Sequence, residues 1–387
     1  GGGAAWMVSG WRQRVLCTCA SLLCASARAI APHASAAYLA APDAIARSVR
    51  AREARLDPHA TPLDLWPLLM AHDAATTYIA ADATGDDEGE REGKGVGLSP
   101  VVRRWSVTQP AGGMARLLGC GARAFDWRPA LDAHTGELHM HHGGVSIPKS
   151  MGEALDEMVE WAARSSSPRV TAAESAADAF IVLAITDCDG GDACVAEAKR
   201  LLGQRNISYV TSDACDELRG VTVAEAVERA ALPGGGAVLA LFDCWEMHYD
   251  SSIACSGFDG SADANAQASS AATGAWHYAC YDDSPTRGYP LERMWAYQNE
   301  TVAGGPPGDG RLWATQILWQ ESPDSVALGE LAGSSLLLDE HRSRLNALTV
   351  ARVVSGDLDV SSGVSLVEIN DVCDSGAALI ATIRGAV

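Results

Sequence analysis

The sequence has few basic residues, shows no repeat of fixed period and contains no long uninterrupted apolar segment. It has 29 lysines and arginines against 49 aspartates and glutamates, which gives a formal net charge of −20 over 387 residues. Nucleic acids and anionic membranes attract basic surfaces, so this deficit excludes a nucleic-acid partner and electrostatic adsorption to anionic lipid. No stretch reaches the roughly 18 apolar residues of a membrane span, so no anchor is expected.

The sequence also lacks a closely spaced pair of Cys-x-x-Cys motifs, which argues against a zinc site. It contains eleven cysteines, and the eight that lie beyond residue 25 form an even set. Such a set is typical of disulfide-bonded secreted proteins. Cys188 and Cys194 flank a short Gly-rich segment and are expected to close a local loop. Sequons at Asn206 and Asn299 agree with glycosylation in that compartment.

The N-terminal region has the pattern of a secretory signal peptide. Arg12 and Arg14 precede an apolar run over residues 15–23, and small residues that fit a cleavage site follow. We therefore expect residues 1–29 to be a signal peptide and residues 30–387 to form a single secreted domain. The alternative is a buried N-terminal helix.

Short apolar runs alternate with helical patterns along the rest of the chain. These runs predict buried strands at 65–70, 122–127, 180–185, 237–242, 312–318, 348–354 and 364–369. Capping boxes at Ser150–Glu153 and Thr222–Glu225 predict two helix starts. This alternation is typical of a parallel sheet covered on both faces, and the length favours an α/β barrel. Gly-rich, Ser-rich or charged stretches predict loops at 82–99, 259–274 and 303–310.

Polar residues cluster where three predicted strands end. His72 and Asp73 follow the first strand, Asp126 and Arg128 end the second, and His142 ends a shorter one. Carboxyl ends of parallel strands form the active-site rim of α/β folds, so these groups are expected to meet. One imidazole can take a proton from an attacking hydroxyl, a second can protonate a leaving oxygen, and a guanidinium can hold phosphoryl oxygens. The set therefore suits phosphodiester cleavage.

These residues and their neighbours resemble the X domain of phosphatidylinositol-specific phospholipases C, in particular the secreted, metal-independent bacterial branch. The resemblance is carried by residues 71–73, 108–109, 121–128 and 141–143, and its strong part spans 65–165. It implies a distorted (β/α)8 TIM barrel. It also implies a phospholipid substrate at a membrane or micelle interface, cleaved by attack of the inositol 2-hydroxyl to give a cyclic inositol phosphate and diacylglycerol.

The resemblance implies a role for each matching residue. His72 would be the general base, His142 the general acid, and Arg128 a contact of the phosphate. Asp371, after the last predicted strand, would orient His72, and Asp73 would support the acid side. Two nearby acids are alternatives to Asp371: Glu368 and Asp374. Because Arg128 stands where the metal-dependent branch has an acidic calcium ligand, we expect no metal or other cofactor, and no stable protein partner is implied.

The sequence departs from the family at two strand ends. Bacterial members carry basic residues there, whereas this chain has Asp187 and Asp243, which with Asp126 we expect to line the substrate site. A different interpretation is that Asp73 and these three aspartates hold a divalent cation. That arrangement would suit a metal-dependent phosphodiesterase of the glycerophosphodiesterase or sphingomyelinase D type. The third interpretation is a secreted barrel that only binds lipid or glycan.

Overall fold

The computed structural model describes residues 56–79, 100–165, 177–247, 291–306, 308–319, 326, 330 and 333–386. The expected signal peptide at 1–29 and the expected loops at 82–99 and 259–274 lie outside these residues. None of the helices in the described segments is both long and apolar enough to cross a membrane.

Strands and helices alternate along most of the described chain. The strands are β1 (Leu68–Ala71), β2 (Ala124–Trp127), β3 (Pro129–Leu131), β4 (Leu138–His142), β5 (Val145–Ser150), β6 (Phe180–Ile185), β7 (Ser208–Val210), β8 (Ala237–Phe242), β9 (Trp245–Met247), β10 (Leu312–Ile317) and β11 (Leu366–Ile369). The helices are α3 (Pro100–Trp105), α4 (Gly113–Gly119), α5 (Met151–Ser165), α7 (Gly191–Gln204), α8 (Val223–Arg229), α11 (Leu291–Gly304), α13 (Leu336–Ser343), α14 (Leu345–Ser355) and α15 (Gly376–Ala386). Short 3₁₀ helices are η3 (Leu63–Leu65), η4 (Ala74–Tyr78) and η5 (Cys215–Leu218).

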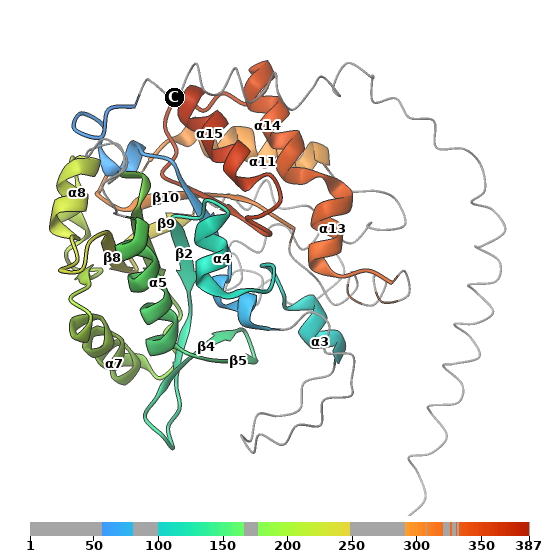
Figure 1. The fold of residues 1–387 in the computed structure, drawn as a ribbon. Helices are drawn as coiled ribbons and strands as arrows, with labels where there is room; N and C mark the ends of the chain where they lie inside the picture. The colour runs from blue at the N-terminus through green and yellow to red at the C-terminus, as the bar shows by residue number, and fades with distance from the viewer. Residues whose placement is uncertain are drawn as a thin grey trace, which may run out of the picture. The chain divides into compact units, whose positions relative to one another are not determined.

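Eight strands form one parallel sheet in the order β7-β8-β6-β2-β1-β11-β10-β9. In the middle of the sheet, Ala71 of β1 pairs with Phe125 of β2 on one side and with Ile369 of β11 on the other. The carboxyl ends of these three strands therefore lie side by side. Figure 1 shows α5, α7 and α8 at the left of the molecule and α11, α13, α14 and α15 at its upper right, with the sheet between the two groups in this view. The predicted parallel α/β sheet is confirmed.

The sheet curls, although the described strands do not close it into a ring. β8 is the second strand from one edge and β9 is the opposite edge, yet only Asp243 and Cys244 separate them in sequence. Three residue steps span at most about 11 Å, so the two sides of the sheet approach each other there. Among the described residues no hydrogen-bonded pairing joins β9 to β7 or β8. The closed ring of the predicted (β/α)8 barrel is therefore not seen.

Successive residues of the strands face opposite sides of the sheet and bury two separate apolar clusters. The inner cluster consists of alternate strand residues closed at one end by η3, η5 and α8; it includes Leu68, Met70, Ala124, Leu239 and Leu366. The outer cluster consists of the intervening strand residues and the apolar faces of the surrounding helices; it includes Leu69, Phe125, Val367, Leu155 and Leu379. Each fully buried leucine, valine, methionine or phenylalanine side chain in these clusters contributes roughly 1.5–3 kcal/mol. The same alternation places His72, Asp126 and Glu368 beyond the inner cluster, toward the carboxyl ends.

Both predicted capping boxes form, and one predicted strand is wrong. Thr222 Oγ1 accepts the Glu225 N–H at 3.3 Å, and Ser150 Oγ accepts the Glu153 N–H at 3.2 Å. The strand expected at 348–354 lies within α14 instead. The buried residues of α14 recur at helical spacing; they are Leu345, Asn346, Thr349, Val350 and Val353. The β-branched residues in this segment are typical of a strand and led to the wrong prediction. The spacing of the buried residues, in contrast, is that of a helix.

A second sheet contains three antiparallel strands in the order β3-β4-β5. His142 ends β4, so it does not come from the end of a parallel strand as expected. The neighbouring His141 ring lies 3.0 Å from the Asp187 carbonyl oxygen and 3.1 Å from that of Gly143. The contact with Asp187 joins the small sheet to the end of β6. A different element therefore delivers the second imidazole to the same edge.

Three disulfides cross-link the described residues. The predicted local pair Cys188–Cys194 is confirmed, and Cys215 pairs with Cys244. Cys120 pairs with Cys373 across 253 positions, joining the end of α4 to the segment that follows β11. Closing so long a loop restricts the unfolded chain strongly, and the contribution is typically 2–5 kcal/mol. This disulfide anchors the segment that carries Asn370 and Asp371.

Candidate active site

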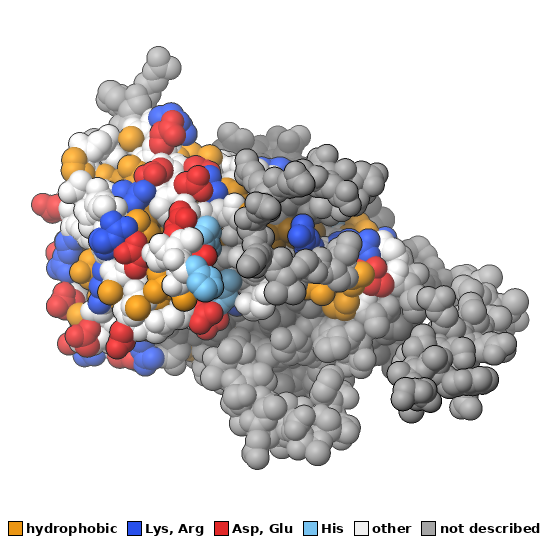
Figure 2. Space-filling model, turned by 90° about the horizontal axis from the view of Figure 1, so that it is seen from below, with side chains coloured by type: hydrophobic (Ala, Val, Ile, Leu, Met, Phe, Trp, Pro, Cys, Tyr) orange, Lys and Arg blue, Asp and Glu red, His pale blue; other side chains and the backbone are white. Residues whose placement is uncertain are grey.

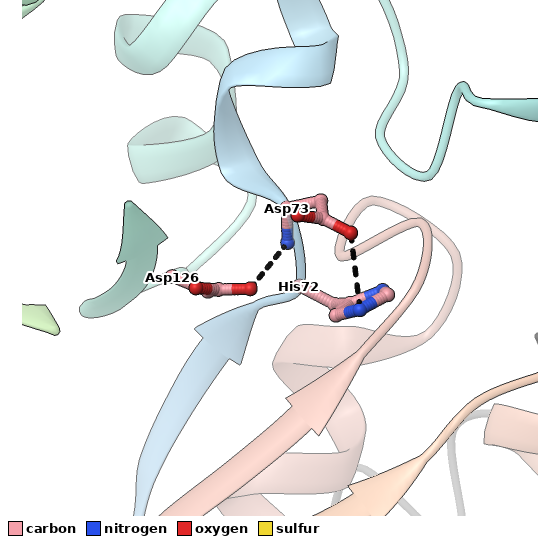
Figure 3. A group of neighbouring side chains, drawn as sticks. All are labelled: His72, Asp73 and Asp126. Atoms are coloured by element: carbon pink, nitrogen blue, oxygen red, sulfur yellow. Dashed lines mark hydrogen bonds and ion pairs between the residues drawn. The ribbon is translucent and has the colours of Figure 1, made fainter. Parts of the chain in front are cut away.

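The candidate site lies at the carboxyl ends of β2, β1 and β11. His72 and Asp73 follow β1, and Asp126 near the end of β2 accepts a hydrogen bond from the Asp73 N–H at 3.1 Å through Oδ2. Asp73 adopts the left-handed conformation, with φ of 43°, which non-glycine residues rarely do. Figure 3 shows its carboxylate turned toward His72.

Asp73 is the point on which the other groups converge. Its Oδ2 lies 3.2 Å from His72 Nε2 and 3.1 Å from His142 Nε2. Its Oδ1 lies 3.0 Å from Arg128 Nε, and Arg128 Nη2 lies 2.8 Å from Asp126 Oδ2. The His72 and His142 rings are 6.5 Å apart between centroids, edge to face. Two imidazoles and a guanidinium therefore meet around one carboxylate.

Fixed hydrogen-bond partners decide which nitrogen of His72 carries the proton. Asn370 Nδ2 donates to the Trp319 carbonyl oxygen at 2.8 Å, so its Oδ1 faces the imidazole. That Oδ1 lies 2.9 Å from His72 Nδ1 and can only accept. Nδ1 is therefore the N–H of the neutral ring, and Nε2 is the basic nitrogen that faces Asp73.

His142 is oriented in the same way by a different partner. Its Nδ1 lies 2.9 Å from the carbonyl oxygen of Ser106, which can only accept, so Nδ1 carries a proton. Its Nε2 consequently points at Asp73. The side chain is 10% exposed and that of Arg128 is 23% exposed, whereas His72 is buried. The site thus opens to solvent on the side of His142 and Arg128.

Burial and neighbouring charges set the protonation states. Burial lowers the pKa of His72 more than the Asp73 carboxylate raises it, so the ring is neutral at pH 7. Burial opposes ionisation of Asp73, but Arg128, His142 and His72 together lower its pKa to about 2. Burial likewise disfavours the charge of Arg128, yet Asp126 and Asp73 outweigh it and raise its pKa. The site therefore holds a neutral base, a fixed cation and a fixed anion.

Glu368 is a fully buried acid beneath this group. Its Oε2 accepts a hydrogen bond from Gln316 Nε2 at 2.7 Å, and its Oε1 has no hydrogen-bond partner among the described residues. Burial and the negative charge of Asp126 raise its pKa to about 8, so it is mostly protonated at pH 7. A neutral Glu368 keeps a third negative charge away from Asp73 and Asp126.

Thr108 and Gln109 hold the backbone around His72. Thr108 Oγ1 donates to the His72 carbonyl oxygen at 2.8 Å. Gln109 Nε2 donates to the same oxygen at 3.0 Å and to that of Ile369 at 2.9 Å. Both residues are fully buried. They couple the ends of β1 and β11 and so limit movement of the imidazole.

The structure brings most of the predicted site residues together and corrects one contact. His72, Asp73, Asp126, Arg128 and His142 form the cluster described above. The expected contact between Asp371 and His72 is wrong, because Asn370 occupies that place. Instead, Asp371 Oδ2 lies 2.9 Å from His341 Nε2 on α13. The strand alternation explains this: Leu366, Glu368 and Asn370 share the inner face, so the next residue points elsewhere.

Asp187 and Asp243 lie at the ends of β6 and β8 and are exposed. Among the described residues, His72, Asp73 and Asp126 have ligand atoms within 4.8 Å of one another and could bind one metal ion. Asp187 and Asp243 do not belong to this group. The four-aspartate cation site of the alternative interpretation is therefore not assembled. Figure 2 shows histidine side chains exposed on one face of the molecule with acidic side chains beside them.

Two residues at the site were missed from the sequence. Asn370 contacts His72, and Glu340 on α13 contacts Asn370. The alternation in β11 was a usable signal for Asn370, since it continues the inner face beyond Leu366. No local pattern indicated Glu340, because α13 reaches the site only through tertiary packing.

No family model matches the sequence, and no curated protein sequence matches it. Solved structures do match the fold. The phosphatidylinositol-specific phospholipase C from Listeria monocytogenes matches with a TM-score of 0.50 and 10% identity, covering 87% of this chain and 98% of that one. Two forms of the S. aureus enzyme match with TM-scores of 0.48 and 0.47, both at 13% identity, covering 85% and 87% of this chain and 96% and 98% of theirs.

The chain therefore has the fold of a bacterial phosphatidylinositol-specific phospholipase C. This confirms the predicted resemblance at the level of the fold.

Proposed function

We propose that this protein is a secreted phosphodiesterase that cleaves phosphatidylinositol or a related lipid phosphodiester without a metal ion. The observation that carries the proposal is the convergence of His72 Nε2, His142 Nε2 and Arg128 Nε around Asp73, at 3.0–3.2 Å. A neutral imidazole, a second imidazole and a cation within reach of one phosphorus atom can together perform general acid–base cleavage of a phosphodiester.

The residues divide the proton transfers between them. His72, whose lowered pKa keeps it neutral, removes the proton of the inositol 2-hydroxyl through Nε2. The hydroxyl oxygen bonds to phosphorus as the bond to the diacylglycerol oxygen breaks, and His142 gives its Nε2 proton to that leaving oxygen. Arg128 stabilises the charge on the phosphoryl oxygens. Asp73 stabilises the protonated form of either imidazole, and the product is a cyclic phosphodiester.

The remaining features of the proposal are supported by the fold and the sequence. The short connection between β8 and β9 supports a distorted barrel as the architecture. Three disulfides support secretion, which the pattern at 1–29 would direct. Asp126 would orient Arg128, while Asp187 and Asp243 would contact the lipid headgroup at the rim. Asn206 and Asn299 are exposed and would be the glycosylation sites.

An assay of diacylglycerol release from mixed micelles tests the proposal. We expect release from phosphatidylinositol in the presence of EDTA, at a rate equal to that with added Ca²⁺ or Mg²⁺. Phosphatidylcholine, which has no hydroxyl next to the phosphate, should not be cleaved. Failure to cleave any lipid phosphodiester would leave the lipid- or glycan-binding interpretation.

The metal-dependent alternative has one observation in its favour. His72, Asp73 and Asp126 bring ligand atoms within 4.8 Å of one another, and this set suits a divalent cation. Against it, the Arg128 guanidinium already bridges the two carboxylates and would repel a cation at that point. Complete loss of activity in EDTA, with recovery on adding a metal, would establish this alternative and exclude the metal-free mechanism.

A further inference from the structure

The ring of His72 is held by an amide, and a buried acid lies behind that amide. Glu340 Oε1 accepts hydrogen bonds from Asn370 Nδ2 at 2.8 Å and from the Trp319 N–H at 2.7 Å. Glu340 is 2% exposed, and its Oε2 has no hydrogen-bond partner among the described residues. A continuous series of contacts therefore runs from α13 through Asn370 to the imidazole.

We propose that Glu340 is a positioning residue, which acts through Asn370 to keep the proton of neutral His72 on Nδ1 and leave Nε2 free as the base. The catalytic meaning of this inference rests on the function proposed above. The place of the proton on the ring, in contrast, is a property of the free protein. The two can therefore be tested separately.

Two acceptors face Asn370 Nδ2. The Trp319 carbonyl takes one amide proton and Glu340 Oε1 takes the other, both at 2.8 Å. A flipped amide would turn its oxygen toward two acceptors and lose both hydrogen bonds. Asn370 Oδ1 must therefore face His72 Nδ1, and that nitrogen must donate. Without Glu340, one amide proton would be buried and unpaired, and the amide would lose its orientation.

The charge state of Glu340 suits this role. Burial raises its pKa to about 8, and the nearby Asp371 and Asp339 act in the same direction, against its two hydrogen bonds. The charged groups around it are already paired, since His341 contacts Asp371 and Arg342 lies 3.7 Å from Asp339. At pH 7 Glu340 is therefore mostly neutral, and its Oε1 serves as an acceptor without placing a negative charge near His72.

This distinction makes two substitutions of one residue informative. Glu340→Gln keeps the oxygen that accepts from Asn370 and should leave activity at pH 7 within about twofold of wild type. Glu340→Ala removes that oxygen and should lower kcat about tenfold or more, because part of the 10²–10⁴-fold contribution of a general base is lost. Above pH 8 only the wild type places a negative charge behind Asn370, so its rate should diverge from that of Glu340→Gln.

The decisive experiment is ¹⁵N NMR of the histidine rings in the full, substrate-free protein, with His72 assigned by its loss in His72→Gln. We expect wild type and Glu340→Gln to show His72 protonated on Nδ1. Glu340→Ala should populate the Nε2–H tautomer. Asn370→Leu, which keeps the branched shape of the side chain and removes the amide, should do the same if Glu340→Ala fails to fold.

A matched control comes from Asn346, a buried asparagine on α14. Its Nδ2 donates to the carbonyl oxygens of Asn370 and Asp374, at 3.3 and 3.0 Å, and does not reach the imidazole. Asn346→Leu should lower the melting temperature without moving the proton on His72. An Nε2–H tautomer in wild type, or an unchanged tautomer in both Glu340→Ala and Asn370→Leu, would overturn the inference. An inactive protein with the expected tautomers would refute only the proposed function.

Discussion

An aspartate follows each of the strands β1, β11, β6 and β8. The aspartates after β1 and β11 differ from those after β6 and β8 in burial and in ion pairing. Asp73, Asp187, Asp243 and Asp371 all adopt left-handed backbone, with φ between 43° and 55°. Asp73 and Asp371 are buried and ion-paired, whereas Asp187 and Asp243 are exposed. A left-handed aspartate at a strand end is thus a feature of this sheet and not a mark of the site.

The difference between the two regions comes from what packs over them. The small β3-β4-β5 sheet brings His142 to Asp73, and the end of β2 brings Arg128 to it. The Asp73 carboxylate can therefore stay ionised although it is buried. Asp243 has no such cation among the described residues, and although its side chain is largely exposed, partial burial raises its pKa. A buried charge is tolerated only when it is paired, so the partners decide which strand ends can do chemistry.

The largest expected effect is the loss of either imidazole from the paired region. His72→Ala and His142→Ala should each lower kcat on the order of 10²-fold or more, because each removes one proton transfer. The measurement is diacylglycerol release under saturating lipid. His139→Ala is the matched control, since this half-exposed histidine on the same strand as His142 contacts only Glu137 in the described ion pairs. Wild-type turnover in either site variant would reject its role.

The next effect concerns the cation that joins the two buried carboxylates. Arg128→Lys keeps the charge but loses the planar fork, so kcat should fall about tenfold with the melting temperature nearly unchanged. Arg128→Met should destabilise the fold by about 3–5 kcal/mol, because Asp73 and Asp126 would be buried without a partner. Thermal unfolding and kcat separate the two outcomes. Full activity in Arg128→Lys would show that the guanidinium only pairs with its neighbours.

A smaller effect should appear in the pH dependence of stability. The pKa of Glu368 is raised to about 8, so folding favours its protonated form. This stability is fully present below the unfolded pKa near 4.5 and is lost as pH rises through 8. We expect Glu368→Gln to lose a few degrees less in Tm than wild type between pH 5 and pH 8.5. Glu217→Gln, at an exposed position, should follow wild type; an identical curve for Glu368→Gln would contradict the assignment.

The smallest effect should come from the exposed region. Asp187→Asn and Asp243→Asn remove charges that lie outside the ion-paired group, so kcat should stay within about threefold while KM changes modestly, as expected for rim residues. Steady-state kinetics on phosphatidylinositol micelles would separate the two constants. A kcat loss comparable to that of His72→Ala would place either aspartate at the reacting atoms and remove the contrast between the two regions.

The parts of the molecule that could be predicted are those fixed by local pattern. Strands β6 and β8 and both capping boxes follow from apolar runs and short spacings, and His72, Asp126 and Arg128 follow from their positions at strand ends. The role predicted for Asp371 was wrong by one position. Successive residues of a strand point to opposite faces of the sheet, so Asn370 and not Asp371 faces His72.

The parts that could not be predicted depend on tertiary packing. The helix at 345–355 contains a run that also suits a strand, and only its neighbours decide between the two. Glu340 reaches Asn370 across 30 positions, and His142 arrives on a separate antiparallel sheet. No spacing in the sequence specifies such contacts.

The most direct test of the proposed mechanism is ³¹P NMR of phosphatidylinositol micelles during turnover in EDTA. We predict that wild type converts the lipid signal into that of a five-membered cyclic phosphodiester, and that His142→Ala leaves the lipid signal in place over the same time. Direct formation of an acyclic inositol phosphate, or no conversion until a metal is added, would contradict the mechanism.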